Sequence, residues 1–331
     1  MRGNEDRLRK VLFSVVRDYI ERKKPVSSRR VLEITELSWS GATIRNDLKK
    51  LEEMGYLYQP HTSAGRIPTD KGLRFYLEEM LKIRKELKKD DIALELSQRF
   101  PIGDLEMILS ALAGILARSA HGLAVFTKPS MEKMRLVRVH VTPIGEEYAA
   151  VSVITELGLS KVIPVPKMDE KIIEALEKLL NLFSGRTISE LMEAMRSFKA
   201  ETEEGRIVAE IVDGVLRMAT SEGRVIYRGL YEIIGASNQK MADVVKILED
   251  SKKLEEFLDG IDELEVFIGS ENPLEELKDF STFAAPYRKG NEVVGHVALI
   301  TDRFVEYERV YSIVEFTSNR LTEYLTVASR R

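Results

Sequence analysis

The side chains best suited to a specific chemistry lie on one predicted helix, residues 40–54. Its apolar residues recur at helical spacing and define one face, which leaves Arg45 and Asn46 on the other. Arginine can hold guanine N7 and O6 with two hydrogen bonds, and asparagine can do the same for adenine N6 and N7. Both residues lie in the first two turns, the part of a recognition helix that reaches base edges. The pattern therefore predicts a helix that reads DNA.

Further polar residues of the same helix suit the phosphate backbone. Lys49 and Lys50 follow one turn after Arg45 and Asn46, and Ser40 is a good N-cap. The free N–H groups at such a helix N-terminus favour an anion, so we expect phosphate contacts there. An ordinary surface helix carries similar residues on its solvent face. The helix alone therefore leaves both interpretations open.

A predicted hairpin follows the helix and favours the DNA interpretation. We expect strands at 56–59 and 66–67, joined by a small polar turn that is bracketed by prolines. A wing that approaches the minor groove needs to be thin and to carry a cation. Arg29 and Arg30 lie on the preceding predicted helix, where they would contact the DNA backbone. The residues predicted to contact DNA are Ser40, Thr43, Arg45, Asn46, Lys49, Lys50, His61, Arg66, Arg29 and Arg30.

Charge is unevenly distributed along the 331 residues. Residues 1–89 carry 21 Lys and Arg against 13 Asp and Glu, a net charge of +8, and the remainder carries 29 against 41, a net charge of −12. A basic N-terminal part on an acidic remainder indicates a polyanionic partner for the first part. Solvated charged faces give similar asymmetry, so the charge supports the DNA interpretation without deciding it.

Composition excludes several classes of site. Cysteine is absent, which excludes disulfides, thiolate metal sites and cysteine nucleophiles. The four histidines show neither HxxxH nor HxH spacing, and we expect no metal and no cofactor. No GxGxxG or GxxxxGK(S/T) loop follows residue 90, which disfavours the alternative of an enzyme with a DNA-binding arm, such as a ligase. The polar start and the short apolar stretches predict a cytoplasmic protein without membrane contact.

The predicted elements indicate an α+β protein of several domains. Three helices precede the hairpin, at about 5–23, 27–34 and 40–54, and a long helix to about residue 88 follows it. This order predicts an N-terminal winged helix-turn-helix domain. Later strands of an antiparallel sheet are separated by a helix-rich block at about 169–220, as expected when one domain is inserted into another. The boundaries expected are 1–89 for the first domain, 90–140 with 222–331 for the second, and 141–221 for the insert.

Several of these motifs resemble the HrcA family of bacterial heat-inducible transcription repressors. The resemblance covers the whole chain and is strongest over residues 40–76. The matching segments are Pro25-Val26 with Ser28-Arg29, Thr43-Ile44-Arg45-Asn46-Asp47-Leu48, Leu51-Glu52-Glu53, Gly55-Tyr56-Leu57, Gln59 to Arg66, and Pro68, Thr69, Asp70 and Gly72. Near the C-terminus they are Gly295-His296-Val297 through Arg303, and Tyr307-Glu308-Arg309-Val310. The chain departs from the family pattern at two places. Leu73 stands where the family often has an aromatic residue, and Thr301-Asp302 stands where a Gly-Pro pair is common.

The resemblance implies a fold and a function beyond what the residues themselves indicate. It implies a GAF-like α/β domain that carries an inserted dimerisation domain. It also implies a dimeric repressor of chaperone operons, which binds an inverted-repeat operator and is modulated by the GroE chaperonin. The alternative is a metabolite-switched winged-helix repressor with a ligand in the GAF-like domain. We expect no catalysis in either case.

Two groups of apolar residues each allow more than one role. The first lies in the helix-rich block and suits either a dimer interface or an ordinary core: Leu176, Leu179, Leu180, Leu182, Phe183, Leu191, Met192 and Met195. The second consists of aromatic residues in predicted strands, which we expect to be core residues rather than the lining of an effector pocket: Tyr227, Tyr231, Phe267, Phe283 and Tyr287.

Overall fold

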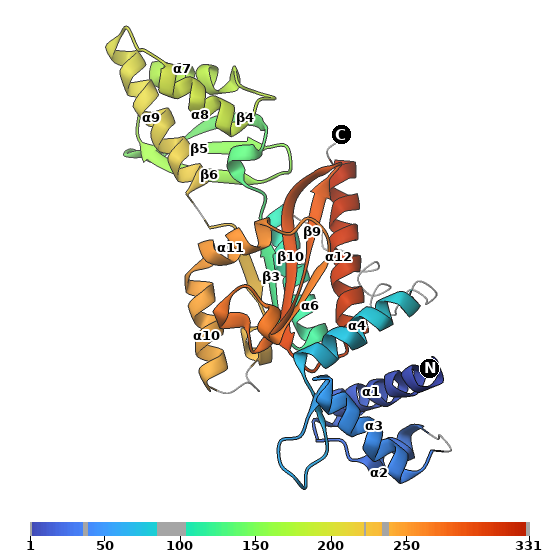
Figure 1. Cartoon of the computed structure of the whole chain (residues 1–331). Coiled ribbons are helices and arrows are strands. Elements are labelled where there is room, and N and C mark those ends of the chain that lie inside the picture. The colour runs from blue at the N-terminus through green and yellow to red at the C-terminus, as the bar shows by residue number, and fades with distance from the viewer. Residues whose placement is uncertain (1, 36–38, 85–103, 222, 234–237, 329–331) are drawn as a thin grey trace.

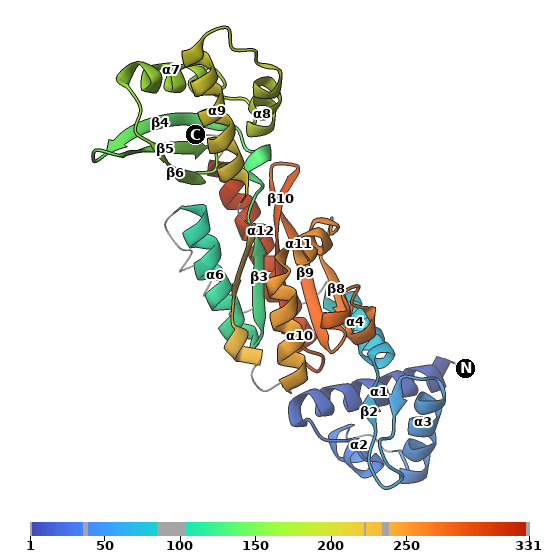
Figure 2. The ribbon, with the colours of Figure 1, turned by 90° about the vertical axis from the view of Figure 1, so that its left-hand side faces the viewer.

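The computed structural model describes residues 2–35, 39–84, 104–221, 223–233 and 238–328. Three parts follow one another along a long axis: a head, a body and an insert (Figure 1). The head is residues 2–84, the insert comprises residues 131–220, and the body comprises the remaining described residues. Figure 2 shows the same order after a quarter turn, with the head and the insert at opposite ends.

The head consists of four helices and a short hairpin. These elements are α1 (Arg2–Arg22), α2 (Ser28–Thr35), α3 (Gly41–Glu53), β1 (Leu57–Tyr58), β2 (Ile67–Pro68) and α4 (Asp70–Arg84). Buried side chains from α1, α3 and α4, such as Val15, Ile44 and Leu73, share one core. The three helices and the hairpin predicted from periodicity are thus confirmed. The predicted end of α4, at about residue 88, lies outside the described residues.

The body is built on an antiparallel sheet in which five strands are described, in the order β7-β3-β10-β9-β8. Helices cover both faces, as Figure 1 shows. α6 and α12 pack on one face, and α10 and α11 pack on the other. Its strands are β3 (Leu123–Thr127), β7 (Val225–Arg228), β8 (Glu265–Ile268), β9 (Phe280–Lys289) and β10 (Glu292–Asp302). Its helices are α6 (Leu105–Ala120), η2 (Leu230–Ile233), α10 (Asn238–Glu249), α11 (Ser251–Asp259), η3 (Gly269–Glu271), η4 (Glu275–Leu277) and α12 (Tyr307–Ala328).

Burial on both faces explains why β3 and β9 read as nearly continuous apolar runs. Phe283 and Tyr287 are fully buried, as expected for core aromatics. The same expectation was wrong for Tyr227 and Tyr231, whose exposed fractions are 39% and 83%. β7 is an edge strand that ends at Arg228, so the chain leaves the sheet where the apolar pattern suggested that the strand continues.

The insert has a sheet and a core of its own. Its elements are η1 (Met131–Lys133), β4 (Leu136–Ile144), β5 (Tyr148–Thr155), β6 (Ser160–Pro166), α7 (Glu170–Asn181), α8 (Ile188–Ser197) and α9 (Glu203–Thr220). Helices cover one sheet face, where Leu176, Leu180 and Leu191 are buried. The β4 edge is capped by α7, because the Asn181 side chain bonds both the N–H and the C=O of Val139, each at 2.9 Å. β4 crosses the boundary expected at residues 140 and 141.

The chain leaves the body after β3 and returns to it at β7, so the two crossing segments lie side by side. Lys128 N–H donates to the Arg224 carbonyl at 2.6 Å, and Arg224 Nε donates to the Lys128 carbonyl at 2.8 Å. The Arg224 guanidinium also pairs with Asp259 at 2.7 Å. Arg224 therefore holds the two crossing segments together at the edge of the body from which the insert extends.

No helix in the described ranges is long and apolar enough to cross a membrane. Thr301-Asp302, one of the two departures from the family pattern, lies at the end of β10. The Asp302 carboxylate accepts a hydrogen bond from Phe304 N–H at 2.8 Å. Leu73, the other departure, is fully buried in the head core.

His296 is a buried group that makes the stability of the body depend on pH. Burial lowers its pKa below the ordinary 6.5, while the Ile261 carbonyl and Asp259 act in the opposite direction, and Arg224 and Arg288 lower it further. The unfolded chain therefore binds more protons than the folded chain just below pH 6.5. We expect the melting temperature to fall as the pH is lowered through this value towards the folded-state pKa.

Thermal unfolding of His296→Gln should show a smaller loss between about pH 7.5 and about pH 5.5 than the unsubstituted protein does. His61→Gln is the matched control, because His61 is exposed. If the melting temperature of His296→Gln depended on pH as that of the unsubstituted protein does, His296 would not be the source of the pH dependence.

Candidate nucleic-acid interface

The start of α3 has the local structure that its sequence predicts. Ser40 is the N-cap, and its hydroxyl accepts a hydrogen bond from Thr43 N–H at 3.1 Å. The two hydroxyl groups are also 2.9 Å apart. Ile44, Leu48 and Leu51 face the core, so the opposite face of α3 is left to solvent.

The outer face of α3 carries polar side chains that converge on one surface. Arg45, Asn46, Lys49 and Lys50 are exposed, and Thr43 is half-buried. Arg45 is folded back against its own helix, since its Nε donates to the Gly41 carbonyl at 3.2 Å. Lys49 Nζ lies 3.7 Å from Glu53. These exposed interactions are weak enough to exchange for a phosphate or a base edge.

A buried carboxylate fixes α3 from behind. Asp47 has an exposed fraction of 2%, and Arg7 of α1 binds both of its oxygens at 2.6 and 3.0 Å. The hydrogen bond to Asp47 raises the pKa of Arg7. Sequence reasoning did not single out this pair, although Asp47 lies on the apolar side of a helix, where a carboxylate requires a partner. The pair sets how α3 is rotated and therefore which residues face outward.

The two arginines of α2 differ in their surroundings. Arg29 is directed to solvent, with a side-chain exposed fraction of 90%, and pairs with its neighbour Glu33 at 3.2 Å. Arg30 instead donates to Asp18 of α1 at 2.9 Å, and the Asp18 carboxylate is almost fully buried. Arg30 therefore fastens α2 to α1.

The hairpin has an exposed tip and a tightly packed base. His61 lies exposed in the turn, which Gln59 closes by donating to the Thr62 and Ala64 carbonyls at 2.9 and 2.7 Å. At the base, Gly65 approaches the main chain of Val26 so closely that a Cβ would lie 2.4 Å from its carbonyl carbon. A side chain at position 65 would therefore push the hairpin away from the head.

Arg66 lies at this base and not at the tip. Its backbone exchanges hydrogen bonds with Val26 at 2.8 and 2.9 Å. Its guanidinium binds Glu52 of α3 at 2.9 Å, and its side chain has an exposed fraction of 19%. The structure thus places Ser40, Arg45, Asn46, Lys50 and other exposed members of the predicted set on one surface, and it places Arg66 and Arg30 behind that surface.

The surface formed by α2, α3 and the hairpin lies at the end of the molecule, away from the body (Figure 1). Among the described residues, no group of three or more potential metal ligands is brought together. The arrangement offers hydrogen-bond donors and positive charge to an extended anionic partner, and it holds them on elements whose inner faces are packed.

Comparisons with known proteins define the class to which this arrangement belongs. Residues 106–311 match the family model described as the HrcA protein C terminal domain. The heat-inducible transcription repressor HrcA of Thermotoga maritima is 40% identical over 329 residues, which are 98% of this chain and 95% of that protein. The corresponding repressor of Ruminiclostridium cellulolyticum is 31% identical over an alignment of 337 positions that covers 96% of this chain and 97% of that protein. A crystal structure of a hypothetical protein is similar with a TM-score of 0.74 and 38% identity, over 98% of this chain and 99% of that one.

These similarities define a mixed α and β protein of the transcription repressor class. The chain belongs to the HrcA family of heat-inducible transcription repressors. Its function is negative regulation of heat-shock genes.

The position of Arg66 leads to a test of its role. If Arg66 acts by holding the hairpin on α3 through Glu52, Arg66→Ala and Glu52→Ala should destabilise the protein non-additively. A double-mutant cycle in chemical denaturation should give a coupling of about 0.5–1 kcal/mol, the range for a partly exposed pair. Additive losses, together with weaker DNA binding only in Arg66→Ala, would instead make Arg66 a phosphate contact.

Proposed function

We propose that the head is a winged helix-turn-helix domain that reads the operator through α3 and uses the hairpin as its wing. The observation that supports this most directly is the pairing of Asp47 with Arg7 at 2.6 Å, because it turns Arg45 and Asn46 outward on a fixed helix. A recognition helix needs this combination of a packed inner face and free donors on its first two turns.

The proposed roles of the ten predicted residues follow from their surroundings. Arg45 and Asn46 read base edges in the major groove. Ser40 and Thr43 present the α3 N-terminus to a phosphate, and Lys49, Lys50 and Arg29 bind further phosphates. His61 approaches the minor groove at the hairpin tip. Arg66 and Arg30 act one step behind the DNA by holding the hairpin and α2 in place.

The proposed domain organisation keeps the order expected from the sequence. Residues 1–89 form the DNA-binding domain, and residues 90 onward with 222–331 form a GAF-like domain, supported by the antiparallel sheet with helices on both faces. The inserted domain ends near residue 221. Its start is better placed before Leu136 than at residue 141, because β4 belongs wholly to the insert sheet.

We assign dimerisation to the insert. A short inverted repeat requires two reading helices related by a two-fold axis. The insert sheet has one face without helices, and its apolar side chains there are unusually exposed: Ile144 55%, Tyr148 55%, Ile154 36% and Val162 65%. Pro164 and Pro166 on β6 discourage edge-to-edge pairing, which leaves face-to-face association as the favoured mode. Leu182, 71% exposed, lies at the end of α7 on the helix side of the sheet and is not part of this patch.

The operator and the modulator are proposed from family membership. The DNA target is the inverted repeat upstream of chaperone operons, and the GroE chaperonin keeps the repressor active. A metabolite-switched repressor is the weaker alternative, since Phe126, Phe283 and Tyr287 fill one face of the body sheet with buried side chains. The names of the relatives describe repression of transcription, which supports a binding protein rather than an enzyme.

Base reading by Arg45 is tested by electrophoretic mobility shifts with an inverted-repeat operator and with random DNA of equal length. Arg45→Ala should weaken binding to the operator by about 1–3 kcal/mol and change binding to random DNA far less. Lys49→Ala is the matched control, because loss of a phosphate contact weakens both complexes alike and makes the salt dependence less steep. Equal losses for Arg45→Ala on both DNAs would assign Arg45 to the backbone, and failure of the unsubstituted protein to prefer the operator would overturn the proposed function.

A further inference from the structure

The head is joined to the body by a set of charged contacts at the start of α4, which we call the head–body latch. It consists of Asp70 and Arg74 on the head side, and of Ser270, Glu271 and Arg303 on the body side. Asp70 Oδ2 accepts hydrogen bonds from the backbone N–H and the hydroxyl of Ser270, each at 3.0 Å. Asp70 Oδ1 pairs with the Arg303 guanidinium at 3.1 Å.

Arg74, one helical turn after Asp70, makes further contacts between α4 and the body. Its Nε donates to Glu271 at 3.0 Å, and its terminal nitrogen contacts both Glu271 and the Val266 carbonyl. The hydrogen bond to Glu271 raises the pKa of Arg74. Glu271 is itself held by Ile268 N–H at 2.9 Å. The latch therefore meets an ordered loop of the body.

Gly269 allows the close approach on which the latch depends. Its φ is +55°, and a Cβ at this position would lie 2.3 Å from the Asp70 carboxylate. Any side chain here would displace Asp70 and strain the backbone. The loop is thus shaped to receive a carboxylate from the head.

A second contact lies at the end of α1. Lys23 has a positive φ of 53°, which is uncommon for a residue other than glycine. Its ammonium group lies 3.5 Å from Asp302, contacts the Phe304 carbonyl, and lies 5.6 Å from the centre of the Phe304 ring. The ring also packs edge-on against Tyr19 at 4.6 Å. The head is therefore held to the body through α4 and through the residue that follows α1, which restricts its rotation as well as its distance from the body.

The latch does not cover the DNA-reading surface. The latch uses the start of α4, and the second contact uses the end of α1. In contrast, α3 and the hairpin project away from the body in Figures 1 and 2. A contact that leaves the reading face open cannot prevent DNA binding by covering that face. The contact therefore acts on the orientation of the head relative to the body.

We propose that the head–body latch positions the reading helix for operator recognition, with Asp70 and Arg74 as positioning residues that do not themselves touch DNA. This rests on the proposed function, because only a two-headed reader of an inverted repeat requires a fixed head orientation. Two rigidly held heads bind as one unit, so the full site gains from the effective concentration of the second head. A half-site requires one head and gains nothing from the latch.

The test uses Arg74→Glu, which places two carboxylates opposite each other in the full-length protein. We expect affinity for the full operator to fall about tenfold or more, while affinity for a half-site stays within about twofold. Adding Glu271→Arg, which restores the ion pair in reverse, should recover part of the full-site affinity. Arg320→Gln is the matched control, because Arg320 pairs with Glu323 within α12. Unchanged or increased full-site affinity in Arg74→Glu would overturn the proposal.

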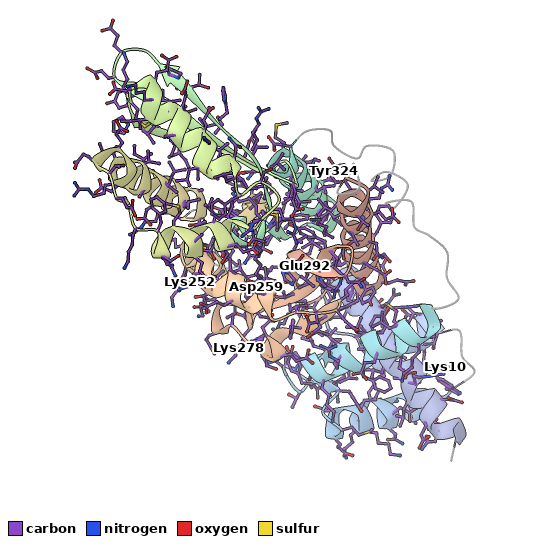
Figure 3. The ribbon with its side chains drawn as sticks, turned by 90° about the horizontal axis from the view of Figure 1, so that it is seen from above. Lys10, Lys252, Asp259, Lys278, Glu292 and Tyr324 are labelled. Atoms are coloured by element: carbon purple, nitrogen blue, oxygen red, sulfur yellow. The ribbon has the colours of Figure 1, made fainter. Side chains whose placement is uncertain are left out.

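A second measurement is independent of DNA. The chain lacks cysteine, so Lys10→Cys and Lys278→Cys introduce one spin-label site in the head and one in the body of each subunit (Figure 3), and excess unlabelled protein leaves one labelled subunit per dimer. The distance distribution should be narrow with the intact latch and broad in Arg74→Glu. A distribution that stays narrow in Arg74→Glu would overturn the latch even if the operator is bound. A broadened distribution in a protein that binds no operator would support the latch and count against the proposed function alone.

Discussion

A carboxylate buried beneath the proposed DNA-reading helix requires a partner, and the rest of the head is arranged around that requirement. Asp47 loses its hydration when Ile44 and Leu48 pack into the core, and Arg7 replaces the lost water with two charge-assisted hydrogen bonds. Because these bonds are directional, they fix the rotation of α3 more closely than apolar packing would. The exposed positions of Arg45 and Asn46 are a consequence.

The same kind of interaction recurs at each junction along the molecule. Arg30 with Asp18 holds α2, and Arg66 with Glu52 holds the hairpin. The head–body latch joins α4 to the body, and Arg224 holds together the two segments that lead to the insert, through Asp259 and the Lys128 carbonyl. One apolar cluster runs from the head into the body and another fills the insert, while partly buried charge pairs add directional contacts at the junctions. A reader of two half-sites depends on such directional contacts, because the spacing of its two reading helices is set by every junction between them.

Periodicity and capping signals predicted much of the fold. Ser40 and the apolar spacing of residues 44–51 were enough to place α3. These features are local, so the sequence carries them directly. The partners of Asp47 and Arg66 come from distant or separate elements, and no spacing rule links Arg7 to Asp47. Tyr231 was misjudged for a related reason, since an apolar run does not say where an edge strand ends.

One pair of reading helices held at the spacing of an inverted repeat has one separation. Spin labels at Met54→Cys, the only thiols in the dimer, measure this separation in the operator-bound protein, because Met54 is exposed at the end of α3 and is not one of the predicted DNA contacts. We expect a single narrow distance peak that corresponds to α3 helices about 34 Å apart, one turn of DNA, or a multiple of it. A broad distribution, or no distance between subunits at all, would contradict it.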